Sequence, residues 1–351
     1  MWKELKLSMI KFFNSYFRYF FYSTEIKFLV IFLGVLCSFS ISPFIHAEVT
    51  GGRVDFSDPA YEKMIPSEIC NCVAFRMDDI QNYWLLDPQL EVLETFKEYN
   101  VPLTIGVIGE SFEGYMANYI HNVTSSENSN IEIANHGWAH EYFSLLDKDQ
   151  QSQIIKISND RIFNETGLLP KIFYPPFGES DNSTLEVLRE HNFTIMSSTF
   201  GSSPPPYPLV ISGINHLPAT ALTADYVADT EMFQGLPHNE TLTDIQNSQI
   251  KFGFSVVALH PQEFSMIENG TYVDKTNPDQ IHELVLLIKE IQKSKLKTVF
   301  VSQISENLVE NPEYQKKESL NSESYGEWII WMIPVIAVVG AGVYLVKFRA
   351  K

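Results

Sequence analysis

Cysteine and basic residues are both scarce in this chain. Its three cysteines exclude a small scaffold stapled by disulfides, so the fold must rely on a hydrophobic core. Lys and Arg total 25 against 43 Asp and Glu, and the formal net charge is -18. No basic stripe interrupts this acidity, and such a surface repels phosphate backbones, which excludes nucleic acid as a partner.

The sequence does not determine whether or how the cysteines form disulfides. Cys37 lies in an apolar N-terminal run, whereas Cys70 and Cys72 are separated by one residue. A disulfide between the latter two would close a very tight loop, so their spacing is equally compatible with two thiols or with partner cysteines elsewhere.

Both ends of the chain are apolar. Residues 28–45 carry no charge and lie between a basic start and a small residue, Ala47. This pattern predicts that residues 1–47 are a cleaved signal peptide, with an uncleaved signal anchor as the alternative. The basic residues of that start are Lys3, Lys6, Lys11, Arg18 and Lys27.

The second apolar run, residues 328–346, is uncharged and long enough to cross a bilayer. Trp328, Trp331 and Tyr344 lie near its ends, as interfacial aromatics do, and the basic tail 347–351 places the C-terminus in the cytoplasm. We therefore expect a cell-membrane protein, single- or double-pass, anchored in the lipid bilayer by this helix with its main domain outside. The domain expected outside the membrane contains glycosylation sequons, which begin at Asn122, Asn164, Asn182, Asn192, Asn239 and Asn269.

Between these ends, strand-like and helix-like segments alternate. An N-terminal extension (48–69) precedes a domain at 70–305, and a polar stalk follows at 306–327. Alternation of this kind predicts a parallel sheet, so the fold class is α/β and the architecture a barrel. Expected strands are 72–77, 101–108, 131–134, 172–174, 193–197, 254–259 and 298–301, and expected helices are 89–99, 112–121, 150–163, 183–191, 242–251 and 278–293.

Reactive side chains follow the predicted strands directly. The carboxyl ends of parallel barrel strands converge on one face, where active sites form. Residues distant in sequence are therefore expected to meet there. The groups concerned are Asp78 with Asp79, His136 with His140, the turn Pro176-Phe177-Gly178, and His260.

The two histidines are four positions apart, which places them on one face if the segment is helical. Two imidazoles with one carboxylate make the ligand set of a catalytic zinc or a facial-triad iron site. An isolated pair at this spacing is more often two unrelated surface histidines, but here the pair follows a strand. Asp78 and Asp79 could merely cap a turn. In an extended chain, however, they point to opposite sides, so one can bind metal while the other approaches water.

In this order, these clusters resemble the polysaccharide deacetylases (NodB homology, carbohydrate esterase family 4). Arg76-Met77-Asp78-Asp79 is similar to the family's Thr-Phe-Asp-Asp block. His136 to His140 is similar to its His-(Ser/Thr)-x-x-His block, Tyr174 to Gly178 to its Arg-x-Pro-x-Gly block, and Leu259-His260 to its late Leu-x-His strand end. The set is more specific than any single block.

The resemblance implies a deformed (β/α) barrel with one divalent metal, usually Zn²⁺, with Co²⁺, Fe²⁺ or Ni²⁺ as alternatives. It assigns Asp79, His136 and His140 as metal ligands. It also implies Asp78 as the general base and His260 as the general acid of a hydrolysis that frees acetate from an N-acetylated glycan. Tyr174, Pro176 and Phe177 are implied as substrate-binding residues, and the backbone N–H at Phe177 as an oxyanion donor.

Three departures from the family pattern bear on this interpretation. Tyr174 stands where the family has the arginine that orients the base, and Ile80 stands where it has glycine after the Asp pair. Strand alternation puts Arg76 on the same side as Asp78, so Arg76 is a hypothetical replacement for that arginine. An Asp/Trp-containing block of the family is also not evident near residues 195–200.

The sequence thus predicts a membrane-anchored, extracytoplasmic, metal-dependent deacetylase of amino sugars in a surface glycan. Two alternatives stay open. One is hydrolysis of another C–N amide bond at the same site, and the other is a non-catalytic glycan-binding envelope protein.

Overall fold

The structure, a computed structural model, describes residues 70–199, 209–211 and 213–310. The predicted signal or anchor segment, the N-terminal extension, the transmembrane helix, the cytoplasmic tail and most of the stalk lie outside these ranges. Among the helices that are described, none combines the length and the apolar character needed to cross a bilayer.

A ten-stranded sheet forms the centre of the described fold. Its strand order is β6-β7-β5-β4-β3-β2-β1-β11-β8, with β14 also pairing to β1. All of its pairings are parallel except β6 with β7. The strands are β1 Cys72–Ile80, β2 Leu103–Val107, β3 Ile131–Asn135, β4 Ile172–Phe173, β5 Ile195–Met196, β6 Leu209–Ile211, β7 Ile214–His216, β8 Ala221–Leu222, β11 Phe254–Leu259 and β14 Lys297–Val299.

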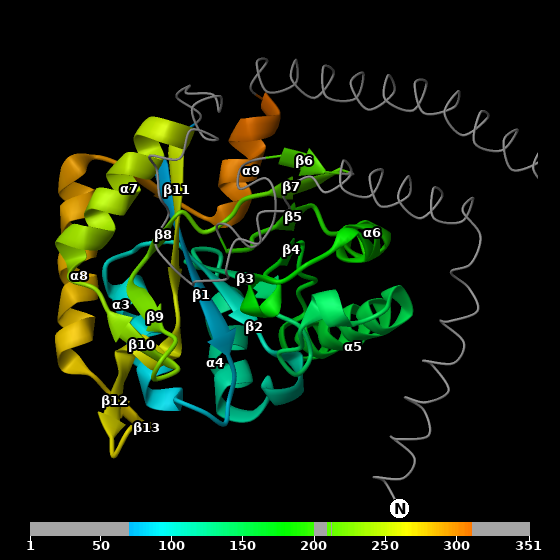
Figure 1. The fold of residues 1–351 in the computed structure, drawn as a ribbon, viewed down its shortest axis with the longest axis horizontal. Coiled ribbons are helices and arrows are strands. Elements are labelled where there is room, and N and C mark those ends of the chain that lie inside the picture. Colours follow the sequence, from blue (N-terminus) through cyan, green and yellow to red (C-terminus); the bar gives the residue numbers. More distant parts are fainter. Residues whose placement is uncertain (1–69, 200–208, 212, 311–351) are drawn as a thin grey trace, which may run out of the picture. The chain divides into compact units, whose positions relative to one another are not determined.

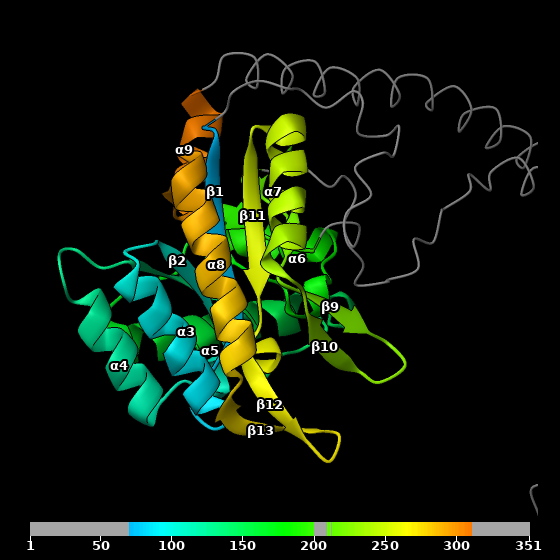
Figure 2. The same cartoon turned by 90° about the vertical axis from the view of Figure 1, so that its left-hand side faces the viewer.

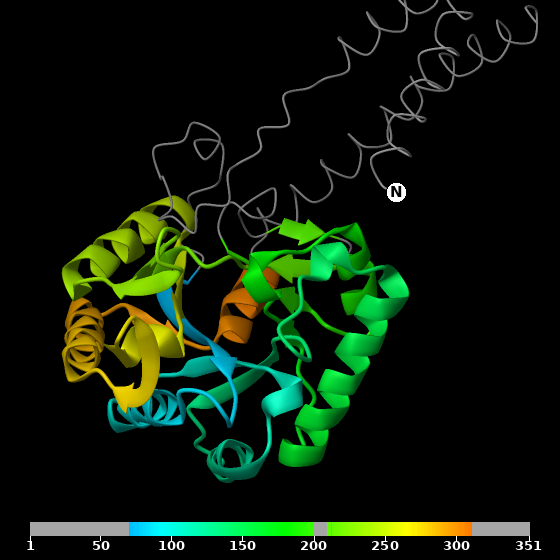
Figure 3. The ribbon, with the colours of Figure 1, turned by 60° about the horizontal axis from the view of Figure 1, so that its bottom comes forward.

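Helices cover the outside of this curved sheet, as the end-on view in Figure 3 shows. Helices α3, α7 and α8 lie on one side, and α5 and α6 on another (Figures 1 and 2). Their bounds are α3 Leu86–Glu98, α4 Gly114–Thr124, α5 Lys148–Thr166, α6 Asn182–Glu190, α7 His238–Phe252, α8 Pro278–Ser294 and α9 Val301–Glu310. The α/β deformed barrel is therefore confirmed, although the described strands form an open, half-barrel sheet.

Both faces of the sheet are buried, which is why its central strands read as continuous apolar runs. Every residue of β1 is buried, including the charged ones. On the outer face, side chains such as Val92, Phe96 and Leu287 pack from the helices onto the sheet. On the inner face, Val301 and Ile304 of α9 join a cluster that contains Tyr174.

Several parts of this architecture differ from the sequence expectation. Strands β6, β7 and β8 lie in a segment that the sequence left unassigned. Helix α9 occupies residues 301–310, where a strand end and the start of a polar stalk were predicted. Two hairpins were not predicted at all: β9 Ala224–Val227 with β10 Met232–Gly235, and β12 Ser265–Glu268 with β13 Thr271–Thr276. The β12–β13 hairpin projects at the end of the fold toward which β1 and β11 run (Figures 1 and 2).

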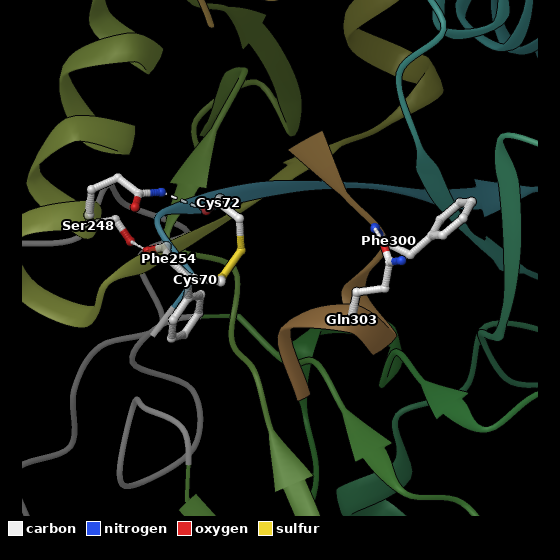
Figure 4. Close-up of a disulfide and its surroundings, with 7 residues drawn as sticks. Cys70, Cys72, Ser248, Phe254, Phe300 and Gln303 are labelled. Carbon is white, nitrogen blue, oxygen red and sulfur yellow. Dashed lines mark hydrogen bonds between the residues drawn. A yellow bond between two sulfur atoms is a disulfide. The ribbon is translucent and has the colours of Figure 1, made fainter. Parts of the chain in front are cut away.

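At the opposite end of β1, Cys70 and Cys72 form a disulfide with a Cα–Cα distance of 5.1 Å. Figure 4 shows this bond where the chain enters the sheet, beside the end of α7. The carbonyl of Cys72 also accepts a hydrogen bond from Gln249 Nε2 at 2.6 Å. The structure thus has the disulfide between Cys70 and Cys72, one of the alternatives that the sequence left open. The bond lies far from the carboxyl end of β1.

Candidate metal centre and active site

The backbone at the end of β1 directs the side chains of Asp78 and Asp79 toward the open end of the barrel. Asp79 adopts a left-handed backbone conformation, with φ 62°. The pairing of β1 with β2 shifts register between Met77 and Ile80. A bulge of this kind re-aims side chains and is common beside active sites. The expectation of simple strand alternation at the Asp pair is therefore corrected, because the chain is not extended at Asp79.

The two histidines come together through a loop. After β3, residues 136–142 are irregular, and Gly137 and His140 both have left-handed backbones, with φ 78° and 60°. Asn135 Oδ1 accepts a hydrogen bond from the Gly137 N–H at 2.8 Å, and the Glu141 carboxylate accepts from the N–H groups of Trp138 and Ala139. The segment that carries the two histidines is therefore not helical, as their spacing allowed, but a turn held in place by these hydrogen bonds.

Asp79, His136 and His140 converge on one point. Asp79 Oδ1 lies 3.2 Å from Nε2 of His136 and 3.2 Å from Nε2 of His140. One ligand atom from each residue falls within 4.8 Å of the others, a group that could hold a metal ion. Asp79 Oδ1 and His136 Nε2 are buried and have no hydrogen-bond partner. Because buried polar atoms are rarely left unsatisfied, this donor set fits a divalent cation.

The electrostatics of this cluster favour a charged carboxylate. Burial alone would raise the pKa of Asp79, but the imidazoles of His136 and His140 outweigh it and hold that pKa well below its usual value. Burial likewise opposes charge on His136, yet the carboxylates of Asp79 and Asp78 raise its pKa. His136 Nδ1 lies 2.7 Å from the carbonyl oxygen of Tyr174, which aims Nε2 at Asp79.

A residue outside the ligand set controls the other oxygen of Asp79. Gln262 Nε2 donates to Asp79 Oδ2 at 2.9 Å, and both side chains are buried. This bond fixes the carboxylate plane and leaves Oδ1 facing the histidines. Gln262 lies two positions after His260, in a short 3₁₀ turn (η5, Pro261–Phe264) that follows β11.

We predict that Gln262→Leu weakens divalent-metal affinity by about ten- to a hundredfold, because such outer-shell bonds orient ligands. The measurement is competition with a chromophoric chelator, using Zn²⁺. Gln153→Leu is the matched control because Gln153 is exposed on α5. Equal affinities for the Gln262 variant and the wild type would remove this role.

Asp78 lies beside the metal cluster and contacts two basic groups. Its Oδ2 is 2.8 Å from Arg76 Nη2 and 3.9 Å from His260 Nε2. The side chains of Arg76 and Asp78 are almost completely buried. The predicted acid–base pair, Asp78 and His260, is therefore brought together at the carboxyl ends of β1 and β11.

His260 is held on two sides. Its ring stacks on Phe233 of β10, with centroids 4.5 Å apart and an interplanar angle of 22°. Its backbone N–H donates to Glu263 Oε1 at 2.6 Å. Burial lowers the pKa of the His260 imidazole, and the nearby Asp78 carboxylate offsets this only in part.

Glu263 itself is an unusual buried acid. Burial raises its pKa from the ordinary 4.5 to about 8, although hydrogen bonds from Thr223 and the His260 backbone oppose the shift. One of its oxygens, Oε2, is buried with no hydrogen-bond partner. Near neutral pH the folded protein therefore holds this carboxyl in its protonated form.

This shift makes stability depend on pH. Below the unfolded pKa both states are protonated and the contribution of Glu263 to stability is fully present. It is lost progressively as pH rises toward the folded pKa, because only the unfolded chain releases the proton. We therefore predict that Glu263→Gln, which cannot ionise, gains on the order of 4 kcal/mol relative to wild type between pH 4.5 and 8.

Denaturant unfolding of both proteins with chelator present, at several pH values across this window, tests that prediction. The exposed Glu268 provides the control variant Glu268→Gln. A stability difference between Glu263→Gln and wild type that does not change with pH would contradict the buried-acid account.

The predicted substrate-binding residues divide between core and surface. Tyr174 and Pro176 are buried, and the Tyr174 side chain is fully enclosed, with its ring 4.6 Å from Arg76 Cζ. The expectation that Tyr174 contacts a substrate is therefore corrected: the inward-facing end of β4 places its ring in the barrel interior. Phe177 is 43% exposed and lies beside His140, at a ring distance of 4.4 Å.

Exposed aromatics surround the metal cluster and His260. Tyr142 stacks on Phe177, with centroids 3.6 Å apart, next to His140. On the His260 side, Tyr226 makes an edge contact with Phe233 at 5.4 Å. The ring centroid of Trp138 lies 5.7 Å from the Arg161 guanidinium.

Sequence reasoning missed Gln262, Glu263 and Phe233. The first two lie two and three positions after His260 and could have been noticed as polar residues at a strand end. Phe233 belongs to a short hairpin in a segment that the sequence left unassigned, and no local signal connects it to His260.

Comparisons with known proteins concern the family of this sequence and its fold. The family model described as "Polysaccharide deacetylase" matches residues 69–196, which include both aspartates and both histidines of the cluster but not His260. Among solved structures, a Mycobacterium smegmatis protein bearing the polysaccharide deacetylase name is 20% identical, with a TM-score of 0.53 over 70% of this chain and 94% of that one. At this identity the likeness shows a shared fold.

Two further structures are similar at lower scores. The Bc1960 peptidoglycan N-acetylglucosamine deacetylase is 18% identical, with a TM-score of 0.46 over 67% of this chain and 87% of that chain. A Clostridium thermocellum family 4 acetyl xylan esterase, solved with a cobalt ion, is 18% identical, with a TM-score of 0.45 over 66% and 89%.

Proposed function

We propose that this protein removes N-acetyl groups from amino sugars of a surface glycan, because residues 69–196 match the polysaccharide deacetylase family model and include an Asp-His-His group that could hold a metal ion. The observation that carries the proposal is the convergence of Asp79 Oδ1 with two histidine Nε2 atoms at 3.2 Å, beside a buried Asp78–His260 pair.

Each site residue has a task in this reaction. When bound, a divalent cation lowers the pKa of water and polarises the acetamide carbonyl. Asp79, His136 and His140 would hold it, with zinc the expected ion. Asp78 accepts a proton from the attacking water, whose oxygen forms the new bond to the carbonyl carbon. His260 donates a proton to the departing nitrogen as the C–N bond breaks, so the products are acetate and a free amine.

The surroundings suit a sugar chain. The backbone N–H at Phe177 lies in the left-handed turn after β4, and the family uses this position to stabilise the developing oxyanion. The exposed pair Tyr142 and Phe177 offers an apolar face of the kind on which pyranose rings stack. These features support an N-acetylated glycan as substrate.

The location of this activity is part of the same proposal. The charge pattern around residues 28–45 and 328–346 supports an outward-facing domain anchored by the C-terminal helix. A surface glycan would then be the accessible substrate, and the sequons would lie on the exported side.

Acetate release from N-acetylglucosamine oligomers tests the proposal. The expected result is release that stops with chelator and returns with added Zn²⁺. Metal binding without acetate release would shift the substrate to another amide. Absence of both from folded protein would favour a non-catalytic binding protein and would contradict the proposal.

A further inference from the structure

Arg76 is a fully enclosed arginine whose position in the site is not explained by packing alone. Its side chain is 1% exposed, and it is the largest of the fully buried side chains in the described part of the chain. Burying a guanidinium is costly unless it is paired and hydrogen-bonded. The acidic partner it contacts is Asp78, two residues along β1.

The guanidinium is clamped on three sides. Its Nη1 donates to the Ser197 backbone carbonyl, to Ser197 Oγ at 2.8 Å and to the Ser198 carbonyl at 3.3 Å. The Tyr174 ring covers its face at 4.6 Å. Gly106 makes room for that ring, because a Cβ there would lie 2.8 Å from Tyr174 Cδ2.

This clamp leaves one amino group to contact Asp78. Arg76 Nη2 donates to Asp78 Oδ2 at 2.8 Å, whereas Asp78 Oδ1 is buried with no hydrogen-bond partner. One carboxylate oxygen is thus fixed, and the other is free to accept a proton. A rigid planar fork achieves this orientation better than a flexible ammonium group would.

We propose that Arg76 is the positioning residue for the general base: it holds Asp78 Oδ2 so that Oδ1 faces the attacking water. This inference rests on the proposed function. The positive charge beside Asp78 comes from Arg76 on β1. Tyr174, at the position where related blocks carry arginine, supplies the aromatic ring against which the guanidinium packs. Arg76, where the family block has threonine, and Tyr174, where it has arginine, are therefore one coordinated change, because the two side chains are in contact.

Three variants of the full-length chain, purified in mild detergent, test the proposal: Arg76→Lys, Arg76→Thr, and the exchange variant Arg76→Thr/Tyr174→Arg. Bound Zn²⁺, kcat and KM for acetate release are measured for each. We expect kcat to fall about tenfold in Arg76→Lys and about a hundredfold in Arg76→Thr, with KM and metal content near wild type. The exchange variant should recover at least about tenfold over Arg76→Thr, because it returns a guanidinium to the same place.

Several outcomes would overturn the role. They are wild-type kcat in Arg76→Lys or Arg76→Thr, loss of metal together with activity in Arg76→Lys, or an exchange variant no better than Arg76→Thr. Arg76→Lys keeps the charge, so it decides the question if Arg76→Thr does not fold. Failure of the proposed function is distinguishable, because the wild type would then release no acetate.

Discussion

Replacing His136 with alanine is expected to abolish metal retention and, with it, acetate release. The imidazole would supply one of three ligand atoms, and it is buried beside Asp79. Removing it leaves Asp79 Oδ1 with a single neighbouring imidazole, that of His140. Zn²⁺ would then have two protein ligands, one fewer than the three that catalytic zinc sites provide. We expect turnover to fall by at least about a thousandfold, since the reaction loses its electrostatic centre.

Elemental analysis after gel filtration measures this effect, and activity is assayed on the same sample. His121→Ala is the matched control, because that histidine is exposed on α4. Circular dichroism establishes whether the His136 variant is folded. A folded His136→Ala protein that retains a full complement of metal would show that the ligands lie elsewhere.

The second large effect is expected at the neighbouring carboxylate. Asp78→Asn should bind metal as the wild type does and lose about a hundred- to ten-thousandfold in kcat, the usual contribution of general acid–base catalysis. The carboxamide keeps the shape of Asp78 but cannot accept the proton from water. Its contact to Arg76 at 2.8 Å can be retained through the amide oxygen, so the fold should be preserved.

Asp79→Asn provides the contrast for this experiment. The substitution is chemically identical and one residue away, yet it weakens the ligand that both histidines face. Metal content should therefore drop in Asp79→Asn and stay constant in Asp78→Asn. Wild-type turnover in metal-loaded Asp78→Asn would remove the general-base assignment while leaving the metal centre intact.

Much of this fold could be predicted from the sequence, because strong apolar patterns mark its central elements. Strand β11 has the bounds that its apolar run predicts, Phe254–Leu259. Helix α8 differs by one residue from the expected 278–293. Prediction failed where elements are short or weakly patterned. Strands β6 to β10, in a segment that the sequence left unassigned, have two to four residues each, too few for a periodicity to appear.

The site shows the same division between local and tertiary information. Strand ends indicated the Asp78–Asp79 pair and the two histidines, because topology alone brings such positions together. The family resemblance then singled out Asp79 as the ligand. The detailed geometry could not be predicted, since it depends on left-handed turns at Asp79 and His140. Nor could the burial of Tyr174, which follows from the packing of α9 and from the Arg76 guanidinium on the barrel interior.

The stoichiometry of divalent metal in the purified full-length chain tests the central claim most directly. The sample is stripped with chelator, reloaded with Zn²⁺, desalted and analysed for metal, with acetate release measured before and after. We predict about one ion per chain, the number that a single three-ligand site holds, and activity that returns with the metal. Folded protein that takes up no metal under these conditions would contradict the account.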